Sequence, residues 1–327
     1  MKSVLKTTAI AVLSVLAVAQ AEEKITLNGN VQTQGTKALY DNDKDNNLDG
    51  FWFRANLGGK YNSEDFEGQI NIRMYAQNVG NKIQADTYWG KYKYKAGDAL
   101  LSLKLGHWKT DWSRSGNFGT YIDQNLKKRG FLARDYSHDA FEFGYKQSIS
   151  ELSVMLATTD ENFNTGYIRI QEDLKFNDAL KASLAYRVNA IDPIQNTAVL
   201  THRVAAKVSY EIMKNFGLYG EVAVIATGED EDLATAENAV EPEYKQDTQY
   251  IPFFVGIEIP TNGILSNLYA EFEYVKDRED FEEGADDFAW TVGIVKKINS
   301  HLKIQYNIYS EKEISDVAMG LRLTTSL

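Results

Sequence analysis

The sequence predicts an all-β fold: a closed antiparallel transmembrane β-barrel of about sixteen strands. Three observations predict it. Apolar and polar residues alternate over many segments of about ten residues, the length with which a tilted strand crosses a bilayer. Short and long connections between these segments also alternate, and the chain begins with an export signal. The link at 109–138, which we call the third connection because it is the third on its rim, is the longest. It is placed to occupy the space that the wall encloses.

The segment 66–77 illustrates the alternation. Phe66, Gly68 and Ile70 share one parity, and Glu67, Gln69 and Asn71 share the other. Since successive strand residues point to opposite faces, this segment is a strand with one apolar and one polar side. The same pattern predicts strands at 24–40, 50–61, 65–78, 84–95, 99–108, 139–147, 151–159, 166–176, 179–189, 202–212, 216–226, 248–259, 267–276, 287–297, 301–310 and 314–326. Pro252 predicts a bulge or irregularity inside its strand, because proline cannot donate a ladder hydrogen bond.

The lengths of the connections indicate a closed barrel with a defined orientation in the membrane. Tight turns at residues such as Asn62 to Glu64 and Ala96 to Asp98 alternate with longer links. Short turns on one rim and long loops on the other are typical of an outer-membrane barrel whose short rim lies in the periplasm. A soluble β-sandwich or propeller explains the alternation of side chains equally well, but it explains the alternation of link lengths less well. The long links are 41–49, 109–138, 160–165, 190–201, 227–247 and 277–286.

Residues 1–21 have the three parts of a secretory signal peptide. Lys2 and Lys6 precede an apolar core, and Ala19 to Ala21 provide a small-residue cleavage site. The mature barrel domain is therefore expected to be 22–327, in the cell outer membrane. The chain has no cysteine and a net charge of −11. These features disfavour a disulfide scaffold, a thiolate site and binding of nucleic acid through a basic surface.

On these features the chain resembles the sixteen-stranded porins of the Gram-negative outer membrane. The run Lys104 to Lys109 before the long third link is loosely similar to that of phosphate-selective members. The resemblance implies a water-filled channel for small hydrophilic solutes, a third loop folded into the lumen, and a possible homotrimer. Surrounding lipid and lipopolysaccharide are the other expected partners. Leu327 departs from the family, in which the last residue is usually aromatic.

Parity also predicts which charges face the lumen, with bases outnumbering acids. The predicted pore constriction, with a mild preference for anions, combines the bases of the third link with three wall bases. These residues are Lys109, Arg114, Lys127, Lys128, Arg129 and Arg134, opposite Arg54, Arg73 and Lys104. The acids predicted to face the lumen are Glu67, Glu142, Asp173, Glu211, Glu221, Glu271 and Glu273.

An enzyme is not expected. The four histidines have no metal-site spacing, and neither a nucleophile elbow nor a phosphate-binding glycine loop is present. We therefore expect no catalytic residue, metal or cofactor. The alternative function is a closed barrel that serves as a surface adhesin or envelope anchor. In that case the third link would plug the lumen and the acidic outer loops would bind the partner.

Overall fold

The computed structural model describes most of the wall of the barrel. The residues described are 25–40, 50–77, 80–110, 112, 138–158, 166–191, 201–214, 216–227, 249–261, 267–277, 286–310 and 316–326. The predicted signal peptide at 1–21, the acidic outer loops and most of the third connection lie outside them. None of the described residues forms a helix long and apolar enough to cross a membrane.

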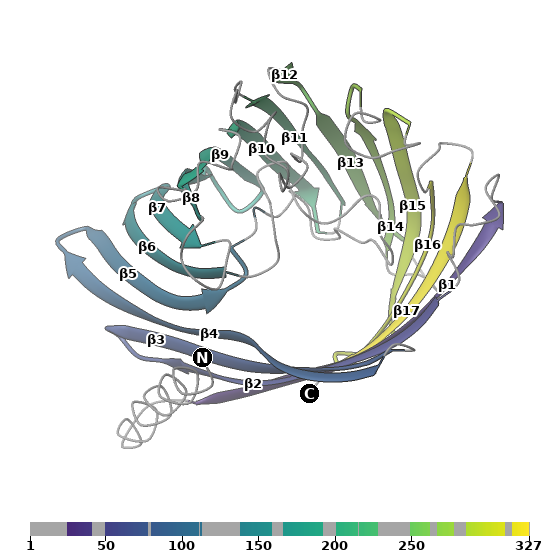
Figure 1. The fold of residues 1–327 in the computed structure, drawn as a ribbon, viewed down its shortest axis with the longest axis horizontal. Helices are drawn as coiled ribbons and strands as arrows, with labels where there is room; N and C mark the ends of the chain where they lie inside the picture. Colours follow the sequence, from purple (N-terminus) through teal and green to yellow (C-terminus); the bar gives the residue numbers. More distant parts are fainter. Residues whose placement is uncertain are drawn as a thin grey trace, which may run out of the picture.

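The described residues form one antiparallel sheet that closes on itself (Figure 1). The first strand pairs with the last, Asn30 lying opposite Ser326. The strands are β1 (Thr26–Tyr40), β2 (Gly50–Asn62), β3 (Phe66–Gln77), β4 (Gly80–Ala96), β5 (Ala99–Trp108), β6 (His138–Gln147), β7 (Ser150–Thr158), β8 (Gly166–Lys175), β9 (Leu180–Ile191), β10 (Thr201–Met213), β11 (Phe216–Thr227), β12 (Gln249–Tyr250), β13 (Phe253–Pro260), β14 (Asn267–Tyr274), β15 (Phe288–Lys297), β16 (Leu302–Ser310) and β17 (Val317–Ser326). Consecutive strands pair along the chain, except that β12 and β13 both pair with β11.

Pro252 interrupts one wall strand, as its lack of an N–H predicts. β12 and β13 lie on either side of Ile251 and Pro252, and both pair with β11. The Pro252 carbonyl still accepts a hydrogen bond from the Ala223 N–H at 3.0 Å. The two pieces therefore occupy one position in the wall, and the barrel has the sixteen strands that the alternation predicts.

The two parities of each strand have opposite environments. Leu105, Leu184 and Val292 belong to the outward set and are largely exposed, whereas Arg187 and Glu221 belong to the inward set and are buried. A soluble barrel with an apolar core would show the reverse. The apolar parity faces outward around the wall, so the hydrophobic residues form the outer surface and the charged residues line the interior.

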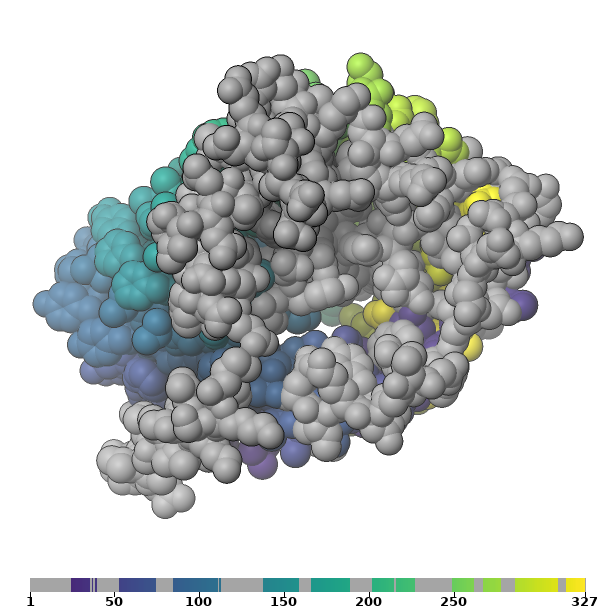
Figure 2. Space-filling view, viewed as in Figure 1, coloured from purple at the N-terminus to yellow at the C-terminus, as the bar shows by residue number. Residues whose placement is uncertain are grey.

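The colours of the space-filling view follow the same order around the molecule, from blue through teal to yellow (Figure 2). Described tight turns join the strands at one rim. Ala99 pairs with Ala96 across the turn that contains Gly97, whose φ of 63° suits glycine. The longest links, after β5 and after β11, leave from the other rim, which we call the loop rim.

Candidate pore lining

The candidate site is the charged inner wall, and its most prominent feature is a row of bases. Arg187 on β9 lies directly opposite Arg169 on β8 and Arg203 on β10. The same cross-strand row continues through Met155, Glu142 and Lys104 to Lys91 on β4. We call its five bases the basic row: Lys91, Lys104, Arg169, Arg187 and Arg203.

Like charges on directly opposite strand residues destabilise a sheet. The three arginines are nevertheless buried, Arg187 and Arg203 each with only 1% of their surface exposed. Guanidinium groups are weakly hydrated and stack well on rings, which makes arginine the base best suited to such a position. The arrangement concentrates positive potential on one side of the lumen.

Aromatic rings hold several of these cations. The Arg187 guanidinium lies 3.9 Å from the centroid of the Tyr167 ring. The Lys104 ammonium is placed between two indoles, 4.0 Å from the Trp108 centroid and 4.5 Å from that of Trp89. Such cation–π contacts stabilise a partly desolvated charge and fix its position. The basic row is therefore a set of pre-oriented charges.

The last residue of β5 and the first residues of the third connection lie against this part of the wall. Trp108 packs with Ala140, Met155 and Tyr167 on the inner faces of β6 to β8. Arg169 Nη1 donates a hydrogen bond to the Thr110 carbonyl at 2.6 Å. Trp112 is buried among residues of β9 to β12. The connection therefore starts along the inner wall; its course from 113 to 137 lies outside the described residues.

A second group of bases lies on β17, β2 and β3, on the far side of the barrel from β8 to β10 (Figure 1). Arg54 donates a hydrogen bond to Gln32, and Arg73 donates through Nε to Asn56 Oδ1 at 2.9 Å. Arg322 donates through Nε and Nη2 to Gln34 Oε1, at 2.9 and 2.6 Å. Side-chain amides from β1 and β2 thus hold these guanidinium groups against the wall.

Arg73 also has a carboxylate partner that a β-bulge supplies. Asn71 lies opposite Thr87 while Ile72 lies opposite Ala85, so Asp86 is the extra residue of β4. Its Oδ2 lies 2.5 Å from Arg73 Nη2. A bulge turns a side chain away from the face that strict alternation gives it. Both Asp86 and Thr87 are consequently buried.

The wall from β11 to β14 carries the opposite charge. We call its four buried glutamates the acidic sector: Glu221, Glu258, Glu271 and Glu273. Tyr219 donates its hydroxyl to Glu271 Oε1 at 2.6 Å, and Asn267 donates its amide to Glu258 Oε1 at 2.5 Å. Lys207 on β10 lies directly opposite Glu221 on β11, so the two charge types meet between these strands.

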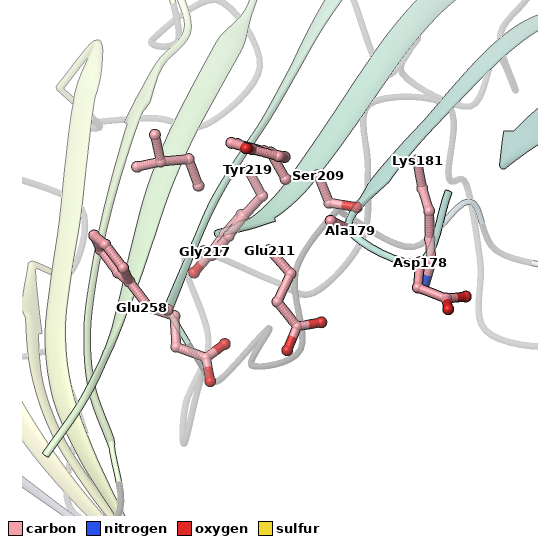
Figure 3. Close-up of a pocket in the computed structure, with 11 residues that line it drawn as sticks. Asp178, Ala179, Lys181, Ser209, Glu211, Gly217, Tyr219 and Glu258 are labelled. Atoms are coloured by element: carbon pink, nitrogen blue, oxygen red, sulfur yellow. The ribbon is translucent and has the colours of Figure 1, made fainter. Parts of the chain in front are cut away.

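A cavity of about 210 Å³ opens beside the acidic sector, close to the short turns. Glu211 and Glu258 point in the same direction along its edge, while Lys181 and Asp178 form its other end (Figure 3). The mixture of carboxylates, an ammonium and the Tyr219 ring makes this a polar recess in the wall.

The described parts of the chain contain no group of three or more His, Asp or Glu residues that could hold a metal ion. Two histidines pair with tyrosines on the outer parity near the loop rim. His107 Nδ1 lies 3.0 Å from Asp139 Oδ1 and stacks on Tyr88. Tyr186 Oη lies 2.7 Å from His202 Nδ1. Tyrosine and histidine at this level suit the polar edge of an otherwise apolar outer surface.

The predicted site residues separate into two sets. The structure places Arg54, Arg73 and Lys104 on the inner wall, and Lys109 is exposed where the third connection begins. Arg54 and Arg73 lie on one side of the lumen and Lys104 within the basic row on another. The remaining predicted bases lie outside the described residues: Arg114, Lys127, Lys128, Arg129 and Arg134.

Sequence reasoning missed three charged residues of the lining. Arg203 shares the parity of Ala205 and Lys207, so alternation alone could have identified it. Glu258 was identifiable in the same way, from the parity of Phe254 and Gly256 on β13. Asp86 could not be found by parity, because the bulge shifts the alternation at that residue.

The fold is that of known porins. A mutant of the Rh. blastica porin superposes with a TM-score of 0.56 at 12% sequence identity, covering 93% of this chain and 100% of that one. A triple mutant of the Rhodopseudomonas blastica porin gives a TM-score of 0.53 at the same identity and coverage. A structure described as "Asymmetric conductivity of engineered proteins" gives 0.56, also at 12% identity and the same coverage. No protein-family model matches the sequence, and a search of curated proteins finds no match.

Proposed function

We propose that this protein is a porin-type channel of the outer membrane that lets small hydrophilic solutes diffuse passively. The observation that carries the proposal is the inversion of the wall: apolar side chains cover the outside, and paired or stacked charges line the inside. An apolar band facing lipid and a polar interior are the features of a water-filled membrane barrel. The likeness to porin structures supports the same function at the level of the fold.

We further propose that the channel prefers anions mildly. The basic row and the guanidinium groups of Arg54, Arg73 and Arg322 place cations on two sides of the lumen. Charge on a narrow lining controls permeation more than charge on a wide, screened mouth. The acidic sector opposes this preference on part of the circumference, which is why the expected selectivity is modest.

The bases predicted for the third link belong to the same proposal. Lys109, Arg114, Lys127, Lys128, Arg129 and Arg134 would add positive charge to the constriction. The contacts of Trp108 at the end of β5, and of Thr110 and Trp112 in the link, support a course of this link inside the barrel, since they hold its first residues against the inner wall. A homotrimer, contacts with lipopolysaccharide and removal of residues 1–21 during export are parts of the proposal.

Channel recordings of the purified full-length protein in planar lipid bilayers test the function. Discrete open-channel steps are expected, since a water-filled lumen conducts ions continuously while it is open. The matched reference is the same preparation unfolded by boiling in detergent before reconstitution. Folded protein that inserts without any conductance would favour the alternative, a closed barrel that acts as a surface adhesin or envelope anchor. No enzymatic activity is proposed.

A further inference from the structure

The polar recess beside the acidic sector is built around one cross-strand row of the inner wall. Glu211 on β10 lies directly opposite Gly217 on β11, and Gly217 lies directly opposite Glu258 on β13. The two glutamates are therefore about 10 Å apart between their Cα atoms, which is two strand spacings. The residue between them has no side chain, so a gap opens over Gly217 with a carboxylate on each side.

The wall fixes the direction of one of these carboxylates. Glu258 is 4% exposed, and the Asn267 amide donates a hydrogen bond to its Oε1 at 2.5 Å. Among the described residues, no donor is hydrogen-bonded to its other oxygen, Oε2. A buried carboxylate with an unused acceptor is unfavourable unless a cation or a further donor satisfies it. Glu258 is thus held in place and can still accept from a ligand in the gap.

The recess has an apolar lining beside its carboxylates. Tyr210, Phe216 and Leu218 contribute to the walls of its 210 Å³, and the carboxylates of Glu211 and Glu258 point the same way along its edge (Figure 3). This volume lies below the roughly 300 Å³ at which pockets for drug-sized ligands begin, so it suits a short chain. The described residues around it do not form a group of acids and histidines that could hold a metal ion.

We propose that this recess binds the primary ammonium group of a small organic solute, whose alkyl part lies along the apolar lining. An ammonium has three N–H donors, which is enough to bond both carboxylates at once, and such charge-assisted hydrogen bonds are strong. The inference rests on the proposed function and deepens it. It gives a channel that is expected to favour anions a defined position for the positive end of a solute.

A binding measurement tests the inference without requiring conduction. Butylamine and 4-aminobutyrate are titrated against the folded full-length protein in detergent micelles, and their binding is followed by ligand-observed NMR after subtraction of the signal from empty micelles. At least one of the two should bind about tenfold or more tightly than 1-butanol, which has the same chain and no charge, because hydrogen bonds to charged groups are worth at least that factor. The tighter of the two shows whether a simple amine or an amino acid is preferred. Binding of both no tighter than that of 1-butanol would overturn the inference.

Three variants locate the binding. Glu211→Gln and Glu258→Gln should each weaken binding of the preferred probe about tenfold, since each removes one charged acceptor. Glu211 is exposed, so its variant keeps the test informative if Glu258→Gln fails to fold. Glu151→Gln is the matched control, because Glu151 also lies near the short turns but pairs with Lys146 at 3.0 Å outside the recess. Unchanged binding in folded Glu211→Gln, an equal loss in Glu151→Gln, or displacement of the probe by an equal concentration of calcium chloride would overturn the inference.

Reversal potentials in planar bilayers provide the second measurement. A saturating concentration of the bound probe should raise the anion-to-cation permeability ratio about 1.5-fold, because an ammonium in the recess offsets the negative charge of its carboxylates. The same addition should leave the ratio of Glu211→Gln/Glu258→Gln unchanged. A wild-type ratio that does not respond would contradict the position of the recess on the ion path. A wild-type protein that does not conduct at all contradicts the proposed function instead, while the NMR result still stands.

Discussion

The basic row and the acidic sector occupy neighbouring parts of one wall, yet they hold their charges in different ways. In the basic row, cations lie over ring faces, as Arg187 does on Tyr167. In the acidic sector, carboxylates accept hydrogen bonds from polar edges, as Glu271 does from the Tyr219 hydroxyl. A ring face is electron-rich and a hydroxyl hydrogen is electron-poor, so aromatic side chains can fix either sign of charge.

The tyrosines of the acidic sector need room that glycine provides. A Cβ built at Gly256 would collide with the Tyr219 ring, and one at Gly293 would collide with the Tyr269 ring. Each ring thus lies flat over the backbone of the next strand, and the Tyr219 hydroxyl reaches Glu271 on β14. Both signs of charge are therefore held in place by specific contacts, so the separation of charge around the lumen is a stable property of the wall.

Removing the charges of Arg187 and Arg203 in the basic row should have the largest effect on ion selectivity. In the double variant Arg187→Gln/Arg203→Gln, we expect the anion-to-cation permeability ratio to fall about fivefold, since two charges near a passing ion contribute on the order of 1 kcal/mol between them. Reversal potentials under a salt gradient measure the ratio. Lys146→Gln/Lys181→Gln is the matched control, because these lysines are exposed near the short-turn rim, where solvent screens them. An equal fall in the control would show that the charges of the basic row affect permeation no more than exposed charges near the short-turn rim do.

Neutralising the acidic sector should act in the opposite direction. Glu221 and Glu273 both lie opposite Phe254, so they form one cross-strand row. Glu221→Gln/Glu273→Gln should raise the anion-to-cation ratio about twofold, a smaller change because Lys207 beside Glu221 already offsets part of its field. The same reversal-potential recording detects it, with Glu151→Gln, at a side chain that is 43% exposed, as the control. A shift toward cations would contradict the assignment of this sector to the lumen.

The glycine positions give a stability test. Gly256→Ala should destabilise the folded barrel by about 1–3 kcal/mol, because the new methyl group forces the buried Tyr219 ring out of place. Gly59→Ala is the control: its nearest neighbour would be Leu27 Cδ2 at 3.9 Å, an ordinary contact. Urea titration followed by folded mobility in unboiled gels compares the two. Equal midpoints would show that Tyr219 is not constrained by Gly256.

The smallest effect is expected outside the wall, in the turn after β8. The hydrogen bond and charge of Lys175 hold the pKa of the Asp178 carboxyl below its usual value. A depressed folded-state pKa contributes stability above the unfolded pKa, and this contribution is lost as the pH falls through the folded value. Asp178 is fully exposed and solvent screens the pair, so Asp178→Asn should leave the urea midpoint unchanged at pH 7 and at pH 3. A clear loss at pH 7 that disappears at pH 3 would contradict this.

The wall was largely predictable from the sequence because alternation reports directly on which side of a sheet a residue lies. All sixteen predicted strands are present, and β5 has the bounds that the pattern predicts, 99–108. The irregularity at Pro252 was predictable for the same reason. Alternation cannot show which distant parts of the chain pack together. Trp112, for example, packs against residues of β9 to β12.

Local exceptions to the pattern set a second limit. The bulge at Asp86 changes the facing of a residue without any proline or glycine to signal it. The alignment of Arg169, Arg187 and Arg203 depends on the register of β8 to β10, which parity leaves open by steps of two residues. The inward facing of Arg169 and Arg187 was therefore predictable from the alternation, whereas their arrangement in a row with Arg203 required the structure.

The anion preference of the charged inner wall is tested by the zero-current potential of the wild-type channel in a planar bilayer separating two concentrations of potassium chloride. The potential should have the sign set by chloride, because fixed cations on the inner wall lower the energy of an anion in the lumen. It should also shrink as both salt concentrations rise together, since screening weakens the field of the wall. A potential of the sign set by potassium, or a protein that inserts and never conducts, would contradict it.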